Sequence, residues 1–236
     1  MKAIRALLCL LAVPAFLAAA PACVTGTLTD YIGLPSGGCL VGTISFEDFS
    51  FSVIGSGGTG VVVLGPSDIT VSPELTLSGS RLRFSAPFSV IGDQFTEYLI
   101  EYLTDPPPPI IHGWDEEMFA ESPVAPGYAQ IDTFLCPGGP FDEDRGEEGV
   151  GCRTAPVEQL TILHDGSPAP ILFDSVDFGA TYQYVGVRTF VKLVANGASS
   201  DIDGWGARAS IVPEPSTFLL GGAALIALGW LRRKRG

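Results

Sequence analysis

The sequence predicts an all-β protein, a β-sandwich with a jelly roll as a variant, on three observations. Ten runs rich in β-branched and aromatic residues recur along the chain, each bounded by Gly, Pro, Asn or Asp. Several runs alternate in polarity, as between Arg81 and Ser85, where Leu82 and Phe84 share one face. The 29 Gly and 19 Pro are spread so that they break the windows in which an amphipathic helix would form.

The predicted strands follow one another from residue 40 to residue 212. They lie at 40–55, 60–65, 68–79, 81–92, 96–105, 129–136, 157–166, 171–179, 181–197 and 205–212. Asn196 and Gly197 close the longest run and predict a tight turn. Two long loops are expected, one over 105–127 and one over the acidic stretch that follows Cys136.

The first residues have the three parts of a secretory signal peptide. Lys2 and Arg5 form a cationic start, an apolar segment follows, and small residues precede Cys23. Cleavage after Ala22 is predicted, which gives a signal peptide at 1–22. Lipoprotein processing is the alternative for a chain that starts with cysteine, but the residues before the cysteine depart from the lipobox pattern.

Export leaves an even number of cysteines in an oxidising compartment, namely Cys23, Cys39, Cys136 and Cys152. Four cysteines allow three pairings. The simplest joins Cys23 to Cys39 and Cys136 to Cys152, and each such loop would contribute about 3 kcal/mol by chain entropy. The chain has no C-x-x-C motif, so a zinc ribbon or a thioredoxin-like site is not expected.

The exported region is strongly acidic. Residues 23–212 hold seven Lys and Arg against 25 Asp and Glu, a net charge of −18. Such a surface repels nucleic acid and anionic lipid, so no nucleic-acid partner is expected.

Few side chains point to catalysis or to a metal. His112 and His164 have no partner at metal-ligand spacing, and no G-x-S-x-G motif is present. The acidic loop offers Asp142, Asp144 and Glu147 as calcium candidates, because hard cations prefer several carboxylate oxygens, but it does not fit the EF-hand pattern. We therefore predict a non-enzymatic protein without a cofactor.

Carbohydrate binding and hydrolysis are the alternatives. Trp114, Trp205, Tyr128 and Tyr182 would stack on sugars in a lectin-like groove, with or without calcium, although aromatic residues in a sandwich are more often core. A secreted hydrolase would need paired carboxylates across a cleft or a serine near His164, and with so many acidic residues no specific pair stands out.

The most specific pattern is the C-terminal segment 213–236. Pro213, Glu214 and Pro215 precede an apolar stretch over 217–231, and a basic tail follows. That tail consists of Arg232, Arg233, Lys234 and Arg235. The stretch predicts a single transmembrane helix of about 22 Å, short for a hydrocarbon core of about 30 Å, with the basic tail in the cytoplasm. The prolines keep the tripeptide before it extended.

This tail resembles the PEP-CTERM sorting signal of exported proteins of Gram-negative bacteria. The resemblance implies that the inner membrane holds the chain transiently by the C-terminal helix and that an exosortase, a membrane-embedded cysteine protease associated with exopolysaccharide production, recognises it. Cleavage at or near Pro-Glu-Pro would release the ectodomain to the cell surface or the extracellular matrix. The catalytic cysteine would then belong to the exosortase.

The middle of the chain resembles a recurrent ectodomain of the same class. The matching stretches are 23–52, with two cysteines before an aromatic strand, and 82–102. We expect the Sec machinery and signal peptidase to export a β-sandwich ectodomain at 23–212. Its expected role is that of a surface or matrix protein associated with exopolysaccharide and biofilm.

Overall fold

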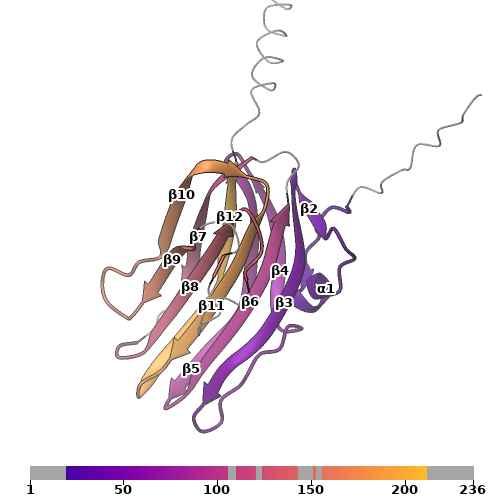
Figure 1. The fold of residues 1–236 in the computed structure, drawn as a ribbon. Coiled ribbons are helices and arrows are strands. Elements are labelled where there is room, and N and C mark those ends of the chain that lie inside the picture. The colour runs from indigo at the N-terminus through magenta and orange to yellow at the C-terminus, as the bar shows by residue number, and fades with distance from the viewer. Residues whose placement is uncertain (1–19, 106–109, 121–123, 143–150, 153–155, 212–236) are drawn as a thin grey trace, which may run out of the picture.

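The computed structural model describes residues 20–105, 110–120, 124–142, 151–152 and 156–211. These residues form two six-stranded sheets that lie face to face (Figure 1). The strands within each sheet pair antiparallel. The predicted all-β, sandwich-like fold is confirmed.

Each sheet combines strands from the first and second halves of the chain. Sheet A runs β2 (Cys39–Val41), β3 (Ile44–Gly57), β6 (Phe95–Asp105), β11 (Val185–Val194), β8 (Tyr128–Pro137) and β9 (Glu158–His164). Sheet B runs β1 (Gly26–Thr27), β4 (Thr70–Thr76), β5 (Gly79–Gly92), β12 (Ala198–Ile211), β7 (Ile111–Ala120) and β10 (Phe173–Tyr182). Because β6 and β11 lie in the middle of one sheet and β5 and β12 in the middle of the other, long-range pairing holds the domain together.

Alternation along the central strands builds the core. In β6, Tyr98, Ile100 and Tyr102 point between the sheets and are buried, while the residues between them are only half-buried on the outer face. From β12, Trp205 stacks on Phe84 of β5, with ring centres 4.9 Å apart. The large aromatic side chains therefore fill the space between the sheets.

The prediction of a long loop over 105–127 is wrong, because the segment contains β7. This strand pairs with β12 on one side and β10 on the other, so it lies inside sheet B. Trp114, Glu116 and Met118 are its buried inward-facing residues, and a carboxylate among inward positions hides the apolar alternation. Two of the three consecutive acidic residues of this strand, Asp115 and Glu116, are thus buried.

Other differences concern segment boundaries. The predicted strand at 60–65 is not a strand; Val62 is 69% exposed, and the Leu64 backbone N–H donates instead to the hydroxyl of Tyr98 at 3.1 Å. The run at 40–55 is split, because Gly42 with a φ of 63° turns the chain between β2 and β3. The run at 181–197 is divided between the end of β10 and β11.

The turn predicted at Asn196 and Gly197 is present, with positive φ values of 49° and 88°. It links β11 of sheet A to β12 of sheet B, so it crosses between the sheets. Gly197 N–H donates to the carbonyl of Gly92, at the neighbouring crossing from β5 to β6, over 2.6 Å. At that crossing the side chain of Gln94 accepts from Ile91 N–H and donates to the carbonyl of Thr59.

A short helix, α1 (Leu28–Ile32), was not predicted. Thr27 caps its N-terminus in a capping box: the Thr27 hydroxyl accepts from Asp30 N–H at 3.3 Å, and Asp30 accepts from Thr27 N–H at 2.7 Å. Leu28 and Tyr31 anchor the helix in the core.

The predicted signal helix and transmembrane helix fall largely or wholly outside the described residues. Among the residues that are described, no helix is long and apolar enough to cross a membrane. The sorting residues Pro213, Glu214 and Pro215 and the basic tail also lie outside them.

Candidate functional site

Both tryptophans predicted as possible sugar contacts are core residues. Trp114 and Trp205 are each 1% exposed, so neither can stack on a ligand at the surface. Tyr182 packs edge to face against Phe178, with ring centres 5.8 Å apart. Tyr128 remains half-buried at the start of β8, on the outer face of sheet A.

The two histidines lie in different sheets. His112 lies on β7 in sheet B, and His164 ends β9 in sheet A. The Nδ1 atom of His164 accepts a hydrogen bond from the Gly166 backbone N–H at 3.2 Å. Among the described residues, no serine hydroxyl is bonded to either ring.

The four cysteines form the simplest of the three possible pairings. Cys23 is bonded to Cys39, and Cys136 is bonded to Cys152. The second disulfide closes the acidic loop, whose residues 143–150 are outside the described set.

Of the three residues predicted as calcium ligands, the structure describes one. Asp142 is described, and its backbone N–H donates to the carbonyl of Gly151 at 2.7 Å. Asp144 and Glu147 lie outside the described residues. Within the described part, no group of three or more His, Cys, Asp or Glu could hold a metal ion.

The outer face of sheet A carries charged side chains in matched pairs. The register places Glu97 of β6 opposite Lys192 of β11, and Glu101 opposite Arg188. An apolar pair of leucine and phenylalanine lies between them in the same register. The two charge pairs are about 13 Å apart along the strands, at about 3.3 Å per residue, and each lines a separate hollow.

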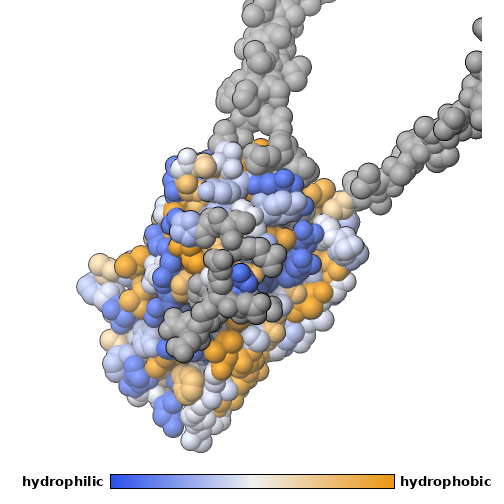
Figure 2. All heavy atoms as spheres, viewed as in Figure 1, coloured by the Kyte–Doolittle hydropathy of each residue, from blue (hydrophilic) through white to orange (hydrophobic). Residues whose placement is uncertain are grey.

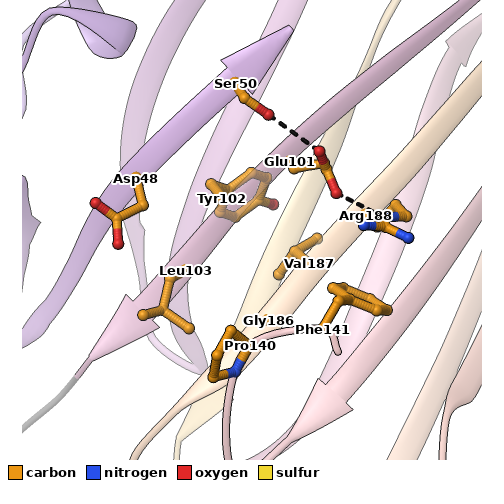
Figure 3. Close-up of a pocket in the computed structure, with 10 residues that line it drawn as sticks. All are labelled: Asp48, Ser50, Glu101, Tyr102, Leu103, Pro140, Phe141, Gly186, Val187 and Arg188. Carbon is orange, nitrogen blue, oxygen red and sulfur yellow. Dashed lines mark hydrogen bonds and ion pairs between the residues drawn. The ribbon is translucent and has the colours of Figure 1, made fainter. Parts of the chain in front are cut away.

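The first hollow, called here the charged hollow, has a volume of about 250 Å³. Figure 3 shows Glu101 between Ser50 and Arg188, with Phe141 beside the guanidinium group. Arg188 Nε donates to Glu101 Oε1 at 2.6 Å, and Ser50 Oγ donates to Glu101 Oε2 at 3.1 Å. The guanidinium carbon lies 4.5 Å from the ring centre of Phe141. Ser50, Glu101 and Arg188 of this hollow are therefore already engaged with one another.

The second hollow, called here the aromatic hollow, lies at the other end of β6 and β11 and has a volume of about 550 Å³. Its lining comes from three strands of sheet A and from the two crossings between the sheets. The lining residues are Asp93, Gln94, Phe95, Glu97, Tyr128, Lys192, Val194, Asn196 and Gly197. Its volume lies within the range of about 300 to 1,000 Å³ that is usual for small-molecule sites.

Sequence reasoning singled out Tyr128 but missed Phe95, which is 38% exposed. The feature of the sequence that could have indicated Phe95 is a pair of glycines, Gly55 and Gly57, on the neighbouring strand β3. A Cβ on Gly57 would overlap the Cε1 atom of Phe95, and one on Gly55 would come within 3.4 Å of Cε2. The ring of Phe95 thus lies against bare backbone.

The surface of the described residues is mixed in character on the face that Figure 2 shows. Figure 2 shows hydrophilic and hydrophobic residues interspersed over the part of the visible face that is not grey. The described residues thus form a two-sheet β-sandwich with hollows on the outer face of sheet A, of which the aromatic hollow has the volume of a small-molecule site.

The chain carries a PEP-CTERM protein-sorting motif, because residues 212–234 match the family model of that description. The predicted likeness of this tail to a PEP-CTERM sorting signal is confirmed. No curated protein matches the chain.

Among solved structures, the chain is similar to the Family 11 carbohydrate-binding module from Clostridium thermocellum, in complex with a β-1,3-1,4-mixed-linked tetrasaccharide. The identity is 10%, the match covers 72% of this chain and 98% of that chain, and the TM-score is 0.22. A TM-score of this size does not establish a shared fold.

Proposed function

We propose that the protein is an exported, non-enzymatic surface or matrix protein of a Gram-negative bacterium, which an exosortase releases from a transient membrane anchor. The sorting motif at 212–234 is the observation that carries this proposal. The Sec machinery and signal peptidase act at the N-terminus, and the released β-sandwich associates with exopolysaccharide in a biofilm.

The position of the last strand supports release at the tripeptide. β12 ends at Ile211, whose backbone N–H donates to the carbonyl of Ser78 at 3.2 Å. The described strands therefore all precede Pro213, and cleavage at or near 213–215 removes none of them. The six residues from 212 to 217 span at most about 20 Å when extended, so the sandwich would sit close to the bilayer until it is cut.

Replacing Pro213 and Pro215 together with alanine is expected to keep the protein in the membrane fraction. The physical reason is that the extended conformation before the anchor is lost when alanine allows the helix to continue outward. The measurement is immunoblotting of membrane, surface and medium fractions. Ser216→Ala is the matched control and should be released normally; a double variant that is released as well as the wild type would contradict the proposal.

A second candidate function is binding of exopolysaccharide by the sandwich itself. The supporting observation is that carboxylates, cations and partly exposed aromatic rings meet in hollows on the outer face of sheet A. Sugar sites commonly combine such groups, because rings stack on aromatic faces while hydroxyls exchange hydrogen bonds with polar side chains.

We expect a column of the exopolysaccharide from the producing cells to retain the protein. If calcium assists binding, a chelator will reduce this retention; if it does not, retention will be unchanged. Trp114→Ala and Trp205→Ala are unsuitable probes, because both side chains are core. Elution in the void volume, with and without calcium, would contradict the second candidate.

A further inference from the structure

The aromatic hollow differs from the charged hollow in the state of its polar groups. Glu101 and Arg188 of the charged hollow are bonded to each other. In the aromatic hollow, by contrast, the side chains of Glu97, Lys192 and Tyr128 make no hydrogen bond or ion pair with any described residue. Their hydrogen-bonding capacity is available to a ligand.

The aromatic rings of the hollow stand on two sides of an apolar floor. The register places Phe95, Val194 and Tyr128 in one row across β6, β11 and β8. Neighbouring strands lie about 4.8 Å apart, so the two aromatic residues start about 10 Å from each other. Because one side of the Phe95 ring packs on Gly55 and Gly57, that residue presents a supported platform.

The polar groups form the next row and the end of the hollow. Glu97 and Lys192 lie opposite each other on the same face, two positions along the strands from Phe95 and Val194. The pair of Glu101 and Arg188 lies four positions further on. At the open end of the strands lies Asn196, whose side chain donates to the carbonyl of Pro126 at 3.2 Å and keeps its amide oxygen as an acceptor. The hollow therefore offers a carboxylate acceptor, an ammonium donor and an amide around an apolar centre.

We propose that the aromatic hollow is a binding subsite for one or two pyranose units of a neutral glycan. A pyranose ring has an apolar face for Phe95 and Tyr128, and its equatorial hydroxyls both donate and accept, as Glu97 and Lys192 require. Anionic sugars are disfavoured, because Glu97 and Asp93 line the hollow and the exported region has a net charge of −18. This inference rests on the second proposed function and assigns it a site.

The test is calorimetric titration of the full chain, held in a detergent without a sugar head group, with β-1,4-linked trisaccharides of glucose, mannose or galactose. At least one is expected to bind. Phe95→Ala should weaken that binding about tenfold, and Phe95→Tyr should retain it, because tyrosine keeps the ring. Lys192→Met should weaken it by a similar factor. Phe173→Ala is the matched control, since Phe173 is 52% exposed on β10 and outside the hollow.

Each other result counts against the proposal in a defined way. If the protein binds the exopolysaccharide column but Phe95→Ala and Lys192→Met keep full affinity, the site is wrong and glycan binding stands. If the column retains the protein but no neutral trisaccharide binds, or a trimannuronate binds more tightly, the neutral ligand class is wrong. If neither column nor trisaccharide binds, both the subsite and the second proposed function are wrong, while the sorting proposal is untouched.

Discussion

Replacing Glu116 with glutamine is expected to remove a large pH dependence from the stability of the sandwich. Glu116 lies on β7, points between the sheets and is fully buried. Thr133 Oγ1 donates to its Oε2 at 2.7 Å, and Oε1 has no partner among the described residues. Burial raises the pKa of Glu116 to about 8 from 4.5, and the charges of Asp115 and Asp174 add to this, while the hydrogen bond from Thr133 opposes it.

The sign follows from where the proton is held more tightly. The folded state keeps the Glu116 proton up to about pH 8, whereas the unfolded chain releases it near pH 4.5. This contribution to stability is therefore present at low pH and is lost as the pH rises towards 8. Between pH 5 and pH 8 the loss is on the order of 4 kcal/mol.

Urea denaturation of the wild type and Glu116→Gln at pH 5 and pH 8.5 measures the effect. The two proteins should be similar at pH 5, and the variant should be more stable by several kcal/mol at pH 8.5. Glu117→Gln is the matched control, because the neighbouring carboxylate points outward to Arg81, with an N···O distance of 3.3 Å. A Glu116→Gln variant whose stability changes with pH in parallel with the wild type would contradict this account.

Truncating Trp205 to alanine is expected to lower the free energy of unfolding by about 3 to 5 kcal/mol. Trp205 is 1% exposed, and its ring stacks on Phe84 at 4.9 Å and lies 5.8 Å from Phe88. Removing the ring would leave a cavity among close-packed aromatic residues, which relaxes only in part. Denaturant unfolding followed by circular dichroism measures the loss.

Leu77→Ala is the control for Trp205→Ala. Leu77 lies fully exposed at the turn between β4 and β5, so its truncation should change stability by no more than about 0.5 kcal/mol. A Trp205→Ala protein that is as stable as Leu77→Ala would contradict the core role of this tryptophan.

Strands with strict alternation were predictable, and strands whose inward residues are polar were not. The segments at 81–92 and 96–105 alternate and form β5 and β6 almost as predicted. The sequence predicts a loop over the segment 111–120, because three acidic residues in succession conceal that Glu116 is buried against Thr133. Conversely, β-branched residues at 60–65 suggested a strand, although no neighbouring strand pairs with them. Tertiary contacts decide both cases.

The sorting motif could be predicted from the sequence, whereas the aromatic hollow could not. Pro213, Glu214 and Pro215 are contiguous, so the sequence alone was enough to predict the sorting motif. The aromatic hollow is assembled from β6, β8, β11 and two crossings, and its members are far apart in the chain. Tyr128 was predicted as a sugar contact, whereas Phe95 becomes visible only when the register places it on Gly55 and Gly57.

The most direct test of the sorting proposal is the mass of the C-terminus of the protein in cells with and without the exosortase. With the exosortase, the released chain should end at or near Pro213 to Pro215. Without it, the chain should extend to Gly236 and stay in the membrane fraction. An intact C-terminus in both strains, or the same shortened C-terminus in both, would contradict processing by the exosortase.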